Sequence, residues 1–132
     1  MTLLAPNVGE DLMLKLITAN AASEVLRLSL FDNDITPGET DTKATYTHVV
    51  GNGFANVVLA NTSWTYTPGA PSSASFPQQT FTFTGPAGLI YGYYVVNNIT
   101  EDLYWAERFT NGPYNIQNNG DEIKVTVNVT LD

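Results

Sequence analysis

The pattern of hydrophobic and polar positions divides the chain into a helical start and a long β-rich remainder. Between residues 7 and 20, apolar residues recur at helical spacing, and Asn7 and Glu10 form a capping pattern at the start. We therefore predict one amphipathic helix over 7–20, whose apolar stripe packs on a sheet or on a partner. The stripe consists of Val8, Leu12 and Leu16, flanked by Met13 and Ile17.

After residue 23 the pattern favours β-strands. Residues 123–131 alternate between apolar residues on one face and polar residues on the other, and residues 80–84 alternate in the same way. Residues 89–96 are almost wholly apolar, which is typical of a central strand buried on both faces. Further strands are predicted over 25–31, 45–50, 54–59, 63–67 and 103–109, with a polar loop over 32–42 and a loop of small residues over 68–75.

These segments amount to about eight strands, separated by turn signals at intervals of about 8–12 residues. We expect a mainly β protein, either an antiparallel β-sandwich or a barrel, with one short N-terminal helix. No internal repeat or linker interrupts the pattern, so residues 1–132 are predicted to form a single domain.

Composition restricts the partners of this domain. Five basic and thirteen acidic residues give a net charge of −8, with one histidine and no cysteine. So few cations argue against binding to nucleic acid or to anionic membranes, and the lack of cysteine excludes a disulfide framework and Cys-ligated zinc. No apolar run approaches the roughly 20 residues of a membrane span, and we expect no signal peptide. Most of the polarity comes from 17 Thr and 13 Asn, which suit the solvated face of strands and turns.

Two segments carry residue types that catalytic or metal sites use. His48 is the only histidine, and no serine lies in a G-x-S-x-G motif, so a surface or edge-strand position is expected for it. Residues 32–34 resemble the start of a calcium loop, but Pro37 and Lys43 occupy the positions where an EF-hand has Gly and Glu. A plain acidic turn is the preferred interpretation, with an irregular calcium site as the alternative. We predict no catalytic residue, no metal ligand and no cofactor.

Glu107 poses a different question. In a regular strand over 103–109 it shares a face with Leu103, Trp105 and Phe109, which would bury a carboxylate at a high cost unless it is paired. A β-bulge would return Glu107 to solvent, and Arg27 would provide a partner. A structural role is expected, because a glycosidase needs two carboxylates and no second one is identifiable.

The aromatic residues allow two interpretations. Packing in the core is the default, whereas a sugar-stacking platform would require at least two of Trp64, Tyr66, Tyr104 and Trp105 to be exposed and coplanar. Gly92, inside a tyrosine-rich run, indicates a bulge or a close approach of the backbone.

Several stretches taken together resemble small virion proteins of tailed bacteriophages, and especially the capsid decoration (cement) proteins of cyanophages. The stretches are residues 3–10 (LLAPNVGE), 28–33 (LSLFDN), 36–37 (TP), 53–55 (GFA), 76–83 (FPQQTFTF), 90–96 (IYGYYVV), 105–109 (WAERF) and the Val- and Thr-rich final strand. The resemblance spans most of the chain and depends on many short matches, with no single diagnostic motif.

This resemblance implies a non-enzymatic, jelly-roll-like β-sandwich that binds the outer capsid surface of the virion after synthesis in the host cytoplasm. It also implies a homotrimer that bridges major capsid protein subunits, with no small-molecule substrate. Leu3, Leu4 and Pro6 would then dock into a neighbouring subunit, or pack on their own domain. The alternative functions are a tail-fibre or baseplate module that binds host surface glycan, and a glycoside hydrolase with Glu107 in a cleft.

Overall fold

The computed structural model describes residues 4–9, 25–69 and 72–131. Strands make up 43% of the structure and the sheets are antiparallel, which confirms the prediction of a mainly β protein. Residues 7–9 are helical, and the remainder of the helix predicted over 7–20 lies outside the described residues.

Eleven strands and two short 3-10 helices are present within the described ranges. The strands are β1 (Leu26–Phe31), β2 (Val57–Leu59), β3 (Thr65–Thr67), β4 (Ser72–Ser75), β5 (Gln79–Thr82), β6 (Gly88–Ile90), β7 (Gly92–Asn97), β8 (Leu103–Arg108), β9 (Tyr114–Ile116), β10 (Glu122–Val125) and β11 (Asn128–Leu131). The 3-10 helices are η1 (Lys43–Thr45) and η2 (Asn61–Ser63).

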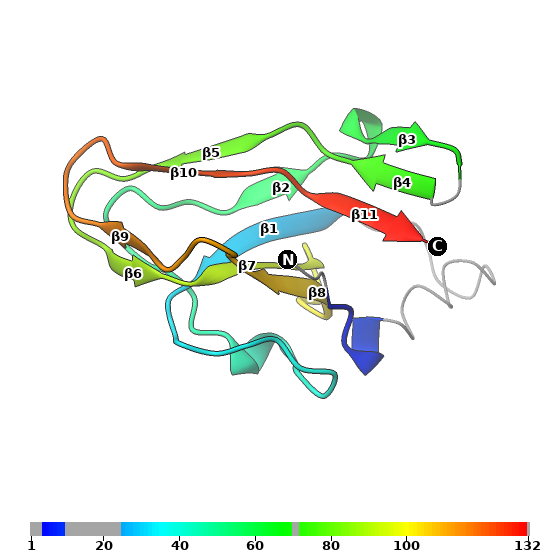
Figure 1. Cartoon of the computed structure of the whole chain (residues 1–132), viewed down its shortest axis with the longest axis horizontal. Helices are drawn as coiled ribbons and strands as arrows, with labels where there is room; N and C mark the ends of the chain where they lie inside the picture. The colour runs from blue at the N-terminus through cyan, green and yellow to red at the C-terminus, as the bar shows by residue number, and fades with distance from the viewer. Residues whose placement is uncertain (1–3, 10–24, 70–71, 132) are drawn as a thin grey trace.

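The strands form four sheets. The largest has the order β2-β1-β7-β8, and the others have the orders β11-β4-β3, β10-β5 and β6-β9. In Figure 1 the four-stranded sheet lies on one side of the molecule, and β3, β4, β5 and β10 run along the other. The β10-β5 and β11-β4 pairs are joined where the backbone N–H of Phe76 donates to the carbonyl of Val127 at 2.9 Å.

The four-stranded sheet is buried on both faces. Its inner face contributes Leu28, Leu30 and Val95 to the main core, where they share a cluster with Phe81 and Ile123 from the β10-β5 sheet. A second, smaller core on its outer face gathers Phe31, Tyr46, Tyr94, Val96, Leu103 and Ala106. All six residues of β7 are buried, which confirms that this run is a central strand.

The apolar alternation in the sequence matches the inward faces of several strands. Phe81 and Phe83 are buried between exposed threonines, as the pattern over 80–84 predicts. Ile123, Val125 and Val127 are also buried, and this alternation continues across the two residues that separate β10 from β11.

Some predicted elements were wrong. Residues 45–50 form no strand, and only an isolated bridge joins His48 to Phe31. The loop predicted over 68–75 contains β4, and β9 was not predicted. The predicted runs 89–96 and 123–131 are each divided into two strands, and the described residues therefore contain eleven strands and not about eight. A strand can form without an apolar alternation when it has pairing partners. β4 is an example, because it pairs with β3 on one side and β11 on the other.

Candidate functional site

The loop that follows β1, residues 32–50, crosses the outer face of the four-stranded sheet. The Asn33 amide donates to the Thr45 carbonyl at 3.0 Å and accepts from the Thr47 N–H at 2.8 Å, which ties the two ends of the loop together. Within the loop, Tyr46 stacks on Tyr94 with ring centroids 5.4 Å apart and also contacts Phe31 at 5.0 Å. The loop is therefore attached to the sheet through an apolar cluster of its own.

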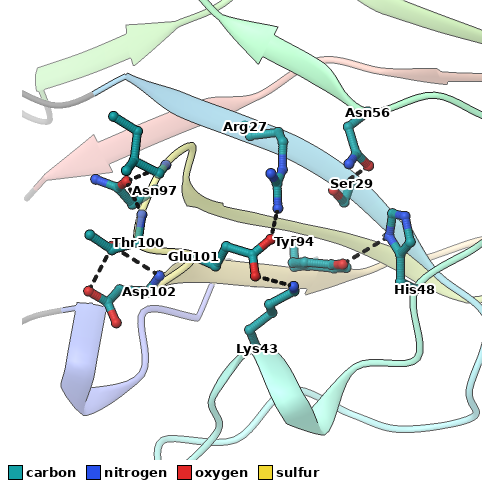
Figure 2. Close-up of polar contacts among 11 residues, drawn as sticks. Arg27, Ser29, Lys43, His48, Asn56, Tyr94, Asn97, Thr100, Glu101 and Asp102 are labelled. Atoms are coloured by element: carbon teal, nitrogen blue, oxygen red, sulfur yellow. Dashed lines mark hydrogen bonds and ion pairs between the residues drawn. The ribbon is translucent and has the colours of Figure 1, made fainter.

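Glu101 links this loop to the sheet through two ion pairs (Figure 2). Its Oε1 lies 2.7 Å from Arg27 Nη2 on β1, and its Oε2 lies 2.6 Å from Lys43 Nζ on η1. The hydrogen bond from Lys43, followed by that from Arg27, lowers the pKa of Glu101 to about 2. Glu101 thus stays ionised at ordinary pH and connects β1, the loop and the turn after β7.

The turn that carries Glu101 has a well-defined hydrogen-bonding pattern. The side-chain oxygen of buried Asn97 accepts from the backbone N–H groups of Ile99 and Thr100 at 2.7 and 2.8 Å. Glu101 has a φ of 64°, a backbone conformation that non-glycine residues seldom adopt. Its N–H donates to the Asn97 carbonyl at 3.1 Å, so the turn orients the carboxylate toward the two cations.

A third ion pair holds the loop at Arg108 on β8. Arg108 Nη1 lies 2.7 Å from Asp34 Oδ1 and donates to the Ile35 carbonyl at 2.8 Å. Its guanidinium also lies over the ring of Tyr91, 5.0 Å from the centroid. The loop is therefore fastened to the sheet by cations at two separate places.

Asp41, in the same acidic loop, also accepts hydrogen bonds that hold the loop in place. Asp41 Oδ2 accepts from the Gly38 N–H at 2.8 Å and from the Tyr46 hydroxyl at 2.7 Å. Burial, assisted by the bond to Asp41, raises the pKa of Tyr46. In the part of the chain that the structure describes, no three His, Cys, Asp or Glu side chains gather where they would hold a metal ion.

His48 lies half-buried at the edge of the same polar region. Its Nδ1 is 3.1 Å from the Tyr94 hydroxyl, and its ring meets Phe54 edge-on with centroids 5.3 Å apart. Burial, followed by the positive charge of Lys43, lowers the pKa of His48. Next to it, Ser29 Oγ donates to Asn56 Oδ1 at 2.7 Å (Figure 2). This arrangement pairs the histidine with a buried tyrosine.

Glu107 is buried and hydrogen-bonded to Tyr93. The register of β8 on β7 shifts, with Trp105 opposite Val95 but Leu103 opposite Val96, which leaves Tyr104 as the extra residue of a bulge. The bulge moves Leu103 to the outer cluster. It does not return Glu107 to solvent, because Glu107 is only 9% exposed.

The partner of Glu107 is the residue opposite it on the neighbouring strand. The Tyr93 hydroxyl donates to Glu107 Oε2, and burial followed by this bond raises the pKa of Tyr93. Arg27, the partner considered from the sequence, binds Glu101 instead. The carboxylate therefore acts as the acceptor for a core tyrosine.

The four aromatic residues considered for sugar stacking lie in different environments. Tyr104 and Trp105 are buried, and Trp64 is half-buried with its ring edge-on to Phe76 at 5.3 Å. Only Tyr66, which is 73% exposed, offers its ring to solvent. These four residues do not form the exposed pair that such a platform requires.

Of the N-terminal residues that were predicted to form an interface, Leu4 lies along the edge of β8. Leu4 exchanges two backbone hydrogen bonds with Ala106, at 3.1 and 3.3 Å, and Pro6 is buried. Leu4 also lines an open groove of about 520 Å³ together with Pro37, Arg108 and Phe109. Leu3 lies outside the described residues. This groove, where the N-terminal arm, the loop and β8 meet, is the candidate docking position.

Sequence reasoning did not single out Glu101. The available signal was the charge pattern: residues 44–100 contain no Asp, Glu, Lys or Arg, so Glu101 is the first charged residue after Lys43.

No family model, curated protein or solved structure matches the chain. None of the helical segments in the described ranges combines the length and apolarity that a membrane span requires.

Proposed function

We propose that this chain is a non-enzymatic decoration (cement) protein of a phage capsid, with the topology of a jelly-roll-like β-sandwich. It binds the outer capsid surface as a homotrimer and bridges neighbouring major capsid subunits, which stabilises the head. Two lines of reasoning support the proposal: the resemblance of many short stretches to such proteins, and the way the charged side chains are used.

The observation that carries the proposal is the fastening of the loop over residues 32–50. Of the four Lys and Arg residues in the described ranges, Arg27, Lys43 and Arg108 are held in ion pairs at 2.6–2.7 Å. The Arg27 and Arg108 pairs join a turn and the loop to the four-stranded sheet, and the Lys43 pair joins the loop to that turn. Glu107 and Asp41 likewise bind tyrosine hydroxyls. Such use of charge supports a rigid module that acts through its surface.

Binding through several copies suits this function. Each protomer adds a modest contact, and the trimer combines three of them so that overall avidity greatly exceeds the affinity of one contact. We place the capsid contact at the groove beside Leu4 and Pro6, because Leu4, Pro37 and Phe109 bring apolar side chains together there on an acidic protein.

The proposal is tested on particles that lack the protein. Purified chain is added back to such heads, and binding is measured by cosedimentation and head stability by release of DNA on heating. We expect saturable binding and a higher release temperature, both weakened by Leu4→Asp and retained by the control Leu89→Asp, whose site on β6 is exposed. Heads that neither bind the protein nor gain stability would contradict the function.

A further inference from the structure

The sheet β11-β4-β3 contains no charged residue. Its strands are NVTL, SSAS and TYT, and it belongs to a chain with thirteen acidic residues. The adjoining β10-β5 pair differs, since β10 carries Glu122 and Lys124. This three-stranded sheet is therefore a place where another molecule can approach without meeting a charged strand.

The register of the sheet defines its two faces. Residues opposite one another share a face, so Thr65, Ser75 and Asn128 form one polar row, and Thr67, Ser73 and Thr130 form another. Tyr66, Ala74 and Val129 share the other face, and Val129 packs against the main core. Tyr66 remains 73% exposed at the end of that row. Tyr66 therefore lies outside the main core and is exposed to solvent.

Both edges of this sheet are open in the described structure. Within the described residues, β3 and β11 each pair with β4 alone. Proteins usually protect exposed edges with a lysine, a proline or a bulge, but β3 and β11 contain no lysine or proline, and their pairing with β4 is in continuous register. All three residues of β3 are exposed.

The charge of the chain indicates what fits this sheet. A foreign partner gains from charge complementarity with an acidic protein. A second copy carries the same net charge of −8 and is repelled wherever the acidic side chains meet. Two copies therefore associate best through an uncharged surface. The β6-β9 pair is uncharged as well, but each of its strands has a buried residue, whereas β3 is exposed at every position. The three-stranded sheet therefore suits a second copy of this chain better than the β6-β9 pair.

We propose that β3 of one copy lies beside β11 of the next, which joins the sheets head to tail and covers Tyr66. Both strands run antiparallel to β4 and therefore parallel to each other, and copies related by a ring axis that runs along these strands keep this direction. Head-to-tail contacts of this kind close into rings. The inference rests on the homotrimer in the proposed function and identifies the surfaces that join its subunits.

The first test measures the mass of the full chain in solution by light scattering. The wild type should be a trimer, and Tyr66→Lys should fall to the 14.4 kDa monomer. Leu89→Lys makes the same change of charge at another exposed strand position and should remain a trimer. Circular dichroism checks that both variants are folded. A folded Tyr66→Lys trimer would overturn the inference.

Cysteine cross-linking tests the head-to-tail arrangement, since the chain has no cysteine of its own. Double variants with Thr130→Cys on β11 and either Thr65→Cys or Thr67→Cys on β3 should yield disulfide-linked dimers and trimers under mild oxidation for one of the two registers. Each single variant should stay monomeric in a denaturing gel. Cross-linking by a β3 cysteine alone, or by neither double variant, would contradict the β3–β11 contact.

Ionic strength provides a third readout. Raising salt from about 0.02 M to about 0.5 M screens repulsion between the acidic copies, so the trimer fraction at fixed concentration should rise or hold. A fall would contradict an uncharged contact. A wild type that is monomeric throughout would overturn this inference and the homotrimer, while binding to heads would still test the decoration role separately. A wild-type trimer that Tyr66→Lys leaves intact would overturn only the inference.

Discussion

Replacing Tyr93 by Phe removes one hydroxyl from the interior and keeps the aromatic ring. That hydroxyl donates to the Glu107 carboxylate, which is 9% exposed and has little access to water. Hydrogen bonds to charged groups contribute about 1.5–3 kcal/mol, and a buried acceptor that loses its donor is not rehydrated. We therefore expect Tyr93→Phe to lower the free energy of unfolding by about 2 kcal/mol.

Thermal unfolding followed by circular dichroism measures this loss. With an unfolding entropy of about 2.1 cal/mol/K per residue, a chain of this length should lose about 7 °C of Tm for 2 kcal/mol. The matched control is Tyr114→Phe, because Tyr114 is 39% exposed. Its unfolding free energy should change by less than about 0.5 kcal/mol.

A double-mutant cycle with Glu107→Gln separates the charge from the packing. If the carboxylate is the acceptor, Tyr93→Phe should cost about 1 kcal/mol less in the Glu107→Gln background, because no buried charge then loses its donor. Strict additivity of the two changes, or a Tyr93→Phe variant with an unchanged Tm, would refute the structural role assigned to Glu107.

Three further outcomes are expected. Glu101→Gln should cost about 1 kcal/mol at pH 7, a value reduced for solvent screening because Glu101 is partly exposed. The lowered pKa means that this contribution is complete above pH 4.5 and lost as the pH falls toward 2, so urea unfolding of wild type and variant should converge there; a constant gap would be inconsistent. Gly92→Ala places a Cβ against the Glu107 carbonyl oxygen and 2.6 Å from the Phe31 ring, and should cost about 1–3 kcal/mol in the same assay, whereas Gly38→Ala, with its nearest atom at 3.5 Å, should be tolerated. Burial raises the pKa values of Tyr46, Tyr93 and Tyr94 above 10.0, so stability is complete below pH 10 and lost above it, and absorbance at alkaline pH should show these tyrosines ionising only as the protein unfolds.

The sequence predicted the parts of the fold that depend on apolar periodicity. The alternation over 80–84 and 123–127 matches buried faces, and the apolar run of 89–96 contains a central strand. These predictions succeed because burial on one face or on both leaves a local pattern. Gly92 was also predicted to mark a close approach, and an added Cβ there would collide with the Phe31 ring.

The remaining features depend on contacts between distant segments, which leave no local pattern. β4 is made of small residues and forms a strand because β3 and β11 flank it. The partner of Glu107 came from the opposite strand, while Arg27 bound Glu101, which is 74 residues away along the chain. A bulge at Tyr104 reassigned Leu103 to the outer core, and a shift of one residue in a strand is not visible in composition.

The most direct test of the proposed function is the position of the protein in an electron-microscopy map of the virion. Maps of particles with and without this chain are compared. We predict a difference density on the outer capsid surface, at three-fold or quasi-three-fold positions between major capsid subunits, that this structure fits as a trimer. Difference density in the tail fibre or baseplate, or none on the capsid, would contradict the account.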